Sequence, residues 1–296
     1  MKFYIFFIAT TILVSCQAQT TSIKLDKNSN DNSLLWEVSG NNLQHHSFLF
    51  GTFHLMCKED IKFSSQLVTA INSSRKVYME LKLDDPSVMM GGILLMNMKN
   101  GTQLKDLYPA SDYERLAAFF KDSLGMSLAF FQSMKPYFLE SVLYPRLMPC
   151  KKLSGVEEEL MTIAKQYRKD IVGLETMEFQ AAVFDSIPYE QQAKELLKTI
   201  DSLDDYKKDF NTMLLAYKDQ RLKDIESLFT KSEFGMQENQ DLLLNNRNKK
   251  WVYQLKGIMH EQPVFVAVGA GHLVGDKGLI ALLRKEGYTV MPLVNK

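Results

Sequence analysis

Two segments near the two ends of the chain share one layout, in which an apolar, strand-like run ends in Gly-x-x-His. The first extends from Ser47 to His54 and the second from Val264 to His272. Glycine lets the backbone turn after a strand, and open α/β sheets bind ligands in the crevice at their strand ends. We therefore predict that both imidazoles, the commonest metal ligands in proteins, point into one crevice. A single histidine at such a turn often bonds only to backbone, so the prediction depends on the pairing of the two motifs.

The distribution of strand-like runs along the chain indicates the fold class. Two of these runs flank a turn signal at Gly40-Asn-Asn and read as a hairpin. Helical patterns fill two long stretches, about 86–150 and 177–258. We predict one α/β domain over residues 34–296, with a mixed central sheet built from N- and C-terminal strands and with large helical insertions. The predicted strands cover residues 34–39, 47–50, 76–83, 170–175, 263–268 and 288–291.

The N-terminal residues have the character of an export signal. One positive charge precedes a short apolar run, which ends at Leu13-Val-Ser-Cys16. The run is too short for a permanent membrane span, and its end resembles the bacterial lipobox, in which cleavage leaves a lipid-modified cysteine. We expect residues 1–15 to be a lipoprotein signal peptide and 16–33 a flexible tether, with the protein anchored through Cys16 in the bacterial cell envelope, on the periplasmic or cell-surface side. An ordinary cleaved signal with an incidental cysteine is the alternative.

The charge balance limits the classes of binding partner, and the cysteine content limits the roles that the cysteines can have. Lysine plus arginine equals aspartate plus glutamate at 35 each, with the signs mixed along the chain, so no nucleic-acid partner is expected. Beyond Cys16, only Cys57 and Cys150 remain. In an exported protein these two can pair, although the sequence does not show whether they are close. Cys57 follows His54 by three residues, so a thiol ligand or nucleophile is the other interpretation.

Carboxylates and one arginine complete the set of candidate site residues. Glu80 lies within a predicted strand and Glu175 ends another. Two histidines and a carboxylate suit a divalent metal. Glu157 has the spacing of a capping-box acid with Ser154, so a helix cap and a site role are both open. Arg247, in a predicted helix, could hold a carboxylate or stabilise an oxyanion.

At these residues the chain resembles the TraB/GumN family, which includes the Tiki proteins. The matching stretches occur in the family's order over most of residues 34–292. They are Leu35-Trp-Glu-Val-Ser-Gly, Phe48-Leu-Phe-Gly-Thr-Phe-His-Leu, Glu80-Leu, Gly155-Val-Glu-Glu-Glu-Leu, Gly173-Leu-Glu-Thr-Met-Glu-Phe-Gln, Asn246-Arg-Asn, Val268-Gly-Ala-Gly-His-Leu-Val-Gly and Gly287-Tyr-Thr-Val-Met-Pro.

The resemblance implies a fold like that of the erythromycin esterase and ChaN group. For Tiki members it implies metal-dependent proteolysis that favours manganese or cobalt, and zinc also suits the ligand types. The matching motifs imply that the metal ligands are His54, His272 and Glu80. They also imply that further site residues are Glu157, Glu175 and Arg247. The chain differs from animal Tiki proteins in its N-terminal lipobox and in lacking their C-terminal anchor, so their signalling-protein substrates do not carry over.

The leading hypothesis is an exported, lipid-anchored, metal-dependent hydrolase that acts on a peptide or amide bond, or on a related small molecule. Glu175 or Glu157 would act as the general base, with Arg247 in support. The alternative is a lipoprotein of the ChaN kind that binds haem or another iron ligand without catalysis. A third hypothesis, an inactive envelope scaffold, predicts neither metal nor haem.

Overall fold

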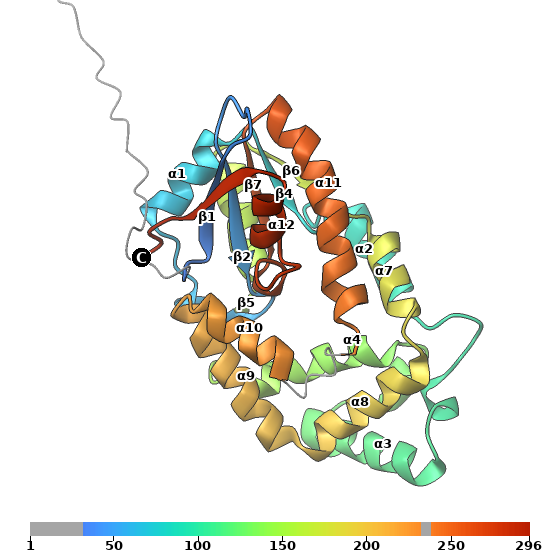
Figure 1. Ribbon diagram of the computed structural model, residues 1–296. Coiled ribbons are helices and arrows are strands. Elements are labelled where there is room, and N and C mark those ends of the chain that lie inside the picture. The colour runs from blue at the N-terminus through green and yellow to red at the C-terminus, as the bar shows by residue number, and fades with distance from the viewer. Residues whose placement is uncertain (1–31, 232–237) are drawn as a thin grey trace, which may run out of the picture.

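A six-stranded mixed sheet forms the centre of the protein, as the computed structural model shows (Figure 1). The structure describes residues 32–231 and 238–296. The predicted signal peptide, Cys16 and nearly all of the tether therefore lie outside the described residues. The strands of this sheet are β1 (Leu35–Gly40), β2 (Ser47–Thr52), β4 (Lys76–Met79), β6 (Asp170–Gly173), β7 (Val264–Gly269) and β8 (Tyr288–Pro292).

The two ends of the chain meet in this sheet, as the sequence predicts. The strand order is β6-β4-β7-β2-β1-β8. The two Gly-x-x-His strands, β2 and β7, are parallel neighbours, and Thr52 lies opposite Gly269. β4 pairs in parallel with both β7 and β6. β2, β7 and β4 are buried along almost their whole length, which explains why they read as continuous apolar runs rather than alternating ones.

The predicted hairpin is confirmed, and it forms the antiparallel side of the sheet. β1 pairs with β2 through register partners such as Trp36 and Leu49. The turn that joins them contains Gly40, Asn41 and Asn42, all with positive φ, a conformation that glycine and asparagine tolerate best. β8 then pairs with the outer side of β1.

Helices cover the sheet and form the two predicted insertions. Figure 1 shows α3 and α8 furthest from the strands, where Leu116, Phe120 and Leu196 contribute to a second apolar core. The helices are α1 (Ser65–Ser73), α2 (Pro86–Leu95), α3 (Ala110–Leu124), α4 (Pro136–Glu140), α5 (Tyr144–Leu147), α6 (Val156–Gln166), α7 (Met177–Asp185), α8 (Tyr189–Asp201), α9 (Leu203–Lys218), α10 (Leu222–Lys231), α11 (Asn246–Glu261) and α12 (Leu279–Lys285). The short helical turns are η1 (Lys58–Asp60), η2 (Leu104–Asp106), η3 (Leu128–Phe131), η4 (Ser141–Leu143), η5 (Asp241–Asn245) and η6 (Ala270–His272).

A small second sheet joins the first helical insertion to the central domain. It consists of β3 (Met56–Cys57) and β5 (Leu153–Ser154), which pair antiparallel. Cys57 and Cys150 form a disulfide, with their Cα atoms 5.9 Å apart. Of the two interpretations of Cys57 that the sequence leaves open, disulfide pairing is therefore confirmed, and the free thiol ligand or nucleophile is wrong.

Candidate active site at the carboxyl edge of the sheet

Each of the four parallel strands delivers one predicted site residue to the same edge of the sheet. His54 follows β2, Glu80 follows β4, Glu175 follows β6, and His272 lies in η6 directly after β7. The carboxyl ends of parallel strands share one edge, which is where open α/β sheets bind ligands. The topology therefore brings together residues that lie up to 218 positions apart in the chain.

The backbone of Gly269 lies where the three predicted metal ligands converge. A methyl group added to Gly269 would lie 3.3 Å from Oε1 of Glu80, 3.7 Å from Cδ2 of His272 and 3.8 Å from Nε2 of His54. The φ angle of Gly269 is −49°, which any residue can adopt. Glycine is thus needed here because a side chain would enter the site, not for the backbone turn that we expected.

Gly51, the glycine of the first motif, allows close packing between β2 and η6. A methyl group on Gly51 would lie 3.1 Å from Cα of Ala270 and 3.0 Å from Cδ1 of Leu273. Gly51 is not among the glycines with positive φ, so the expected turn is again not its role. Its missing side chain lets β2 lie directly against η6, which carries His272. The two motifs therefore contact each other physically.

His272 is held as a neutral imidazole whose lone pair is on Nε2. Nδ2 of Asn248 donates to the Lys277 carbonyl at 2.9 Å, which turns Oδ1 of Asn248 towards Nδ1 of His272 at 2.6 Å. Nδ1 must then carry the proton, and the lone pair is on Nε2. Burial lowers the pKa of His272 to about 3, against the partial opposing effect of Glu80. The Trp251 ring packs against the imidazole at 4.4 Å.

Arg247 bridges the two glutamates that follow β4 and β6. Its Nε and Nη2 atoms donate to the Glu175 carboxylate at 2.8–3.1 Å, and Nη2 also donates to Oε2 of Glu80 at 2.5 Å. Nη1 donates to the Leu243 carbonyl and lies 3.3 Å from Nε2 of His272. The Glu175 side chain is fully buried. Such a forked, charge-assisted arrangement is specific to arginine.

Glu80 lies one residue beyond its strand, not within it as predicted, because β4 ends at Met79. Similarly, β6 ends at Gly173, two residues before Glu175. Oε1 of Glu80 accepts the backbone N–H of Gly269 at 2.9 Å. Burial alone would raise the pKa of Glu80, but charge interactions with His272 and Arg247 bring it down to about 2. Because His272 is neutral near pH 7, the positive charges of Arg247 and His54 keep Glu80 ionised there.

His54 lies at the open side of the site and is paired with Glu157. Oε1 of Glu157 accepts from Nδ1 of His54 at 2.8 Å and from the Thr52 hydroxyl at 2.6 Å. The His54 side chain is 73% exposed. The adjacent carboxylate of Glu157 raises the pKa of His54 to about 9. Burial opposes ionisation of Glu157, but His54 and the hydrogen bonds keep the pKa of Glu157 below its usual value.

The helix-cap interpretation of Glu157 is wrong. α6 begins at Val156, and its N-cap, Gly155, offers no side chain. The Ser154 hydroxyl instead donates to Glu158 and Glu159. The Glu157 carboxylate, attached to the first turn of α6, instead contacts His54 and Thr52.

The charges of the site suit a divalent cation. The site contains three carboxylates, on Glu80, Glu157 and Glu175, and one guanidinium, so its net charge is two negative once His54 is neutral. Both histidines have Nδ1 engaged, so Nε2 is the remaining ring nitrogen of each, and Nε2 of His272 lies 3.3 Å from Nη1 of Arg247. The ligand types of His54, Glu80 and His272 suit a divalent ion. Their donor atoms, however, do not all lie within 4.8 Å of one another. Within the described ranges, the one group whose donor atoms all lie within 4.8 Å is Cys57, Glu59 and Cys150, whose sulfurs form the disulfide.

Several residues of the site were not assigned a role from sequence. Asn248 orients His272, Trp251 packs on both His272 and Arg247, and Thr52 donates to Glu157. Gln180 donates to Glu80 at 3.4 Å. Arg247 and Trp251 are four positions apart on α11, so they share one helix face. That spacing was the available signal for Trp251, whereas nothing local distinguishes Thr52.

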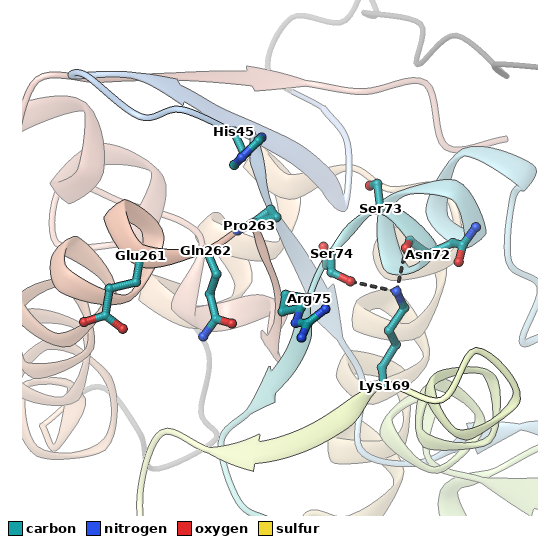
Figure 2. Close-up of a pocket in the computed structure, with 9 residues that line it drawn as sticks. All are labelled: His45, Asn72, Ser73, Ser74, Arg75, Lys169, Glu261, Gln262 and Pro263. Carbon is teal, nitrogen blue, oxygen red and sulfur yellow. Dashed lines mark hydrogen bonds between the residues drawn. The ribbon is translucent and has the colours of Figure 1, made fainter.

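A polar pocket of about 490 Å³ lies at the opposite edge of the sheet. Figure 2 shows it beside Arg75 and Pro263, which precede β4 and β7. Lys169 in this pocket donates to the carbonyls of Asn72 and Ser74, so it closes the C-terminal end of α1. None of the predicted site residues lines this pocket, and parallel sheets rarely bind ligands at this edge.

Fold and site together define an α/β protein whose parallel strands present two histidines and two glutamates at one edge, where an arginine from α11 bridges the two glutamates. The model of the TraB/PrgY/gumN family matches residues 34–292, and the chain belongs to this family. It is also similar to Metalloprotease TIKI1 of Danio rerio, with 22% identity over 88% of this chain, and it spans 63% of that relative's length. No solved structure gives a significant match. Among the residues that the structure describes, no helix is long and apolar enough to cross a membrane.

Proposed function

We propose that this protein is an exported, lipid-anchored, metal-dependent hydrolase that cleaves peptide or amide bonds. The observation that carries the proposal is the convergence of His54, Glu80 and His272 around the bare backbone of Gly269. The family relationship supports hydrolysis in general, and the similarity to a relative described as a metalloprotease supports the metal.

In this proposal His54, Glu80 and His272 hold the metal ion, with manganese or cobalt preferred and zinc as the alternative. A divalent cation held there supplies Lewis-acid polarisation of the scissile carbonyl. Glu157 is better placed than Glu175 to accept a proton, because the Glu175 carboxylate is fully buried and tied to Arg247. The side chain of Glu157 is 14% exposed, beside His54 at the open side. Arg247 holds the Glu80 and Glu175 carboxylates in place through charge-assisted hydrogen bonds.

Export and lipid anchoring at Cys16 remain part of the proposal. The Cys57–Cys150 disulfide supports export, because such bonds persist in oxidising compartments. The haem-binding alternative receives less support from the geometry. An axial histidine faces an apolar slot, whereas Nε2 of His272 faces Arg247 and Glu80.

Elemental analysis tests the proposal. The chain is purified without chelators and compared with a His54→Ala, His272→Ala double variant and with a His45→Ala control, since His45 lies in the pocket at the opposite edge. We expect near-stoichiometric manganese, cobalt or zinc in the wild type and the control, and loss of that metal in the double variant. A peptide-library screen with the loaded protein then tests hydrolysis. Equal metal content in all three proteins, or none in any of them after loading, would contradict the proposal.

A further inference from the structure

The disulfide connects the two segments that carry the His54–Glu157 pair. Cys57 follows His54 by three residues, and Cys150 precedes Glu157 by seven. His54 follows β2 of the central sheet, whereas Cys150 lies just after α5, at the end of the first helical insertion. The bond therefore joins the insertion to the loop that presents one of the proposed metal ligands.

Between the disulfide and the His54–Glu157 pair, the two segments are joined by backbone hydrogen bonds. The N–H of Lys58 donates to the Lys152 carbonyl at 2.9 Å, next to the disulfide. At the other end, the N–H of Val156 donates to the carbonyl of Phe53 at 3.1 Å. β3 and β5 pair between these two bonds. We call this unit, residues 53–58 paired with 150–157, the disulfide clamp.

The clamp is tightest at its His54 end. A methyl group on Gly155 would lie only 2.8 Å from the carbonyl oxygen of His54, so glycine is needed for the two backbones to approach this closely. The same approach allows Glu157 to reach Nδ1 of His54 at 2.8 Å. A displacement of 150–157 away from 53–58 would therefore separate the carboxylate from the imidazole.

The small sheet cannot supply this rigidity by itself. β3 and β5 contain two residues each, and isolated two-stranded pairs are marginally stable in water. The Lys58–Glu159 ion pair across the clamp involves a Lys58 side chain that is 56% exposed, so it contributes little. The disulfide is the covalent connection between the two segments at the far end of the clamp, and it adds to the packing of Met56 and Val156 in the main core.

We propose that the Cys57–Cys150 disulfide is a positioning element of the active site, which holds Glu157 against His54 and makes hydrolysis depend on the intact bond. The inference rests on the proposed function for its catalytic consequence. Its structural part, that the bond keeps the clamp closed, stands on the contacts alone.

The test compares the full chain with its Cys57→Ser, Cys150→Ser double variant at a temperature where both are folded. Amide hydrogen exchange is measured at Val156 and Lys58 in the clamp, and at Leu293, which donates to the Leu35 carbonyl on the far side of the sheet. We expect exchange to become about tenfold faster or more in the clamp, with Leu293 unchanged. We also expect kcat/KM for peptide hydrolysis to fall by about tenfold or more, because misplaced catalytic groups lose rate steeply.

A bond with only a general stabilising role would give a different pattern. Exchange at Leu293 would then rise together with exchange at Val156, or the clamp amides would stay protected and hydrolysis unchanged, and either result overturns the proposal. If the double variant does not fold, the same amides and the same activity are followed in wild type treated at low temperature with tris(2-carboxyethyl)phosphine, a reductant without thiol groups. Faster clamp exchange in a chain that hydrolyses no peptide would count against the proposed hydrolase, not against the clamp.

Discussion

At the scale of single residues, the site depends on groups that hold one another in a defined charge and orientation. Asn248 fixes which nitrogen of His272 carries the proton, and Arg247 donates hydrogen bonds to the Glu80 and Glu175 carboxylates and holds them in place. Gly269 provides the space in which the proposed ligands meet. Each role follows from a contact, so each can be tested by one substitution.

Gly269→Ala should block the site while leaving the fold nearly unchanged. The φ angle suits alanine, but its methyl group would lie within 4 Å of Glu80, His54 and His272. We expect metal content and hydrolysis to fall by about tenfold or more, with a small change in melting temperature. Gly257→Ala on α11 is the control, because nothing lies within 4 Å of its methyl group. The control should retain metal and gain about 0.5–1 kcal/mol in stability.

Arg247→Met should destabilise the protein strongly. It leaves the fully buried Glu175 carboxylate without its cation, and removing one partner of a buried ion pair costs about 3–5 kcal/mol. Urea unfolding measures the loss. Lys256→Met on the same helix removes an ion pair whose side chains are both more than 40% exposed, and should cost at most about 1 kcal/mol. Similar losses for the two variants would show that Arg247 does not stabilise the buried carboxylates.

At the scale of elements, the helical insertions contain their own buried charge. Glu140 ends α4 and lies near Thr199 and Glu195 of α8. Burial, with a further contribution from Glu195, raises the pKa of Glu140 from its usual 4.5 to about 8. Packing of α4 against α8 therefore favours the neutral acid, and ionisation opposes that packing.

This raised pKa predicts that stability falls as pH rises. Between about pH 4.5 and pH 8 the unfolded chain has released the Glu140 proton while the folded protein retains it. The contribution of Glu140 to the free energy of unfolding is therefore complete below pH 4.5. It is lost as the pH rises towards 8, at up to about 1.4 kcal/mol per pH unit. Urea midpoints measured at pH 5 and pH 8 should differ less in Glu140→Gln than in wild type. An identical difference in both proteins would show that Glu140 does not retain its proton.

At the scale of the whole molecule, the site depends on a sheet that needs both ends of the chain. β8 covers the outer side of β1 and buries Tyr288 and Val290. β1 in turn pairs with β2, which leads to His54. The C-terminal strand contributes no site residue and yet supports the position of one.

Deleting residues 288–296 should therefore unfold the whole domain, not only remove its last strand. The deletion removes the buried side chains of Tyr288, Val290 and Leu293, each worth about 1.5–3 kcal/mol, from a total stability of about 5–15 kcal/mol. Circular dichroism melting should show loss of the cooperative transition. Deleting only Lys296, which is exposed, should leave the transition unchanged. A truncated chain that still melted cooperatively and bound metal would contradict this account.

Much of the fold could be predicted because its signals are local. Apolar runs bounded by turn residues marked the six main strands, and two matched motifs predicted that β2 and β7 lead to one crevice. The exact ends of β4 and β6 were predicted too far along the chain, since Leu81 and Leu174 are buried like strand residues but lie beyond the pairing. The apolar pattern of the sequence indicates which residues are buried. The end of a strand is instead set by where backbone pairing with the neighbouring strand stops.

The sequence by itself determined the α/β class, the paired histidines and the acidic and basic residues available to them. Only the tertiary structure decided that Arg247 bridges Glu80 and Glu175, that Asn248 orients His272, and that Glu157 pairs with His54 instead of capping a helix. The same holds for the bond between Cys57 and Cys150, which are 93 residues apart. The physical reason is that periodicity and turn chemistry act over a few residues, whereas these contacts depend on how distant helices pack against the sheet edge.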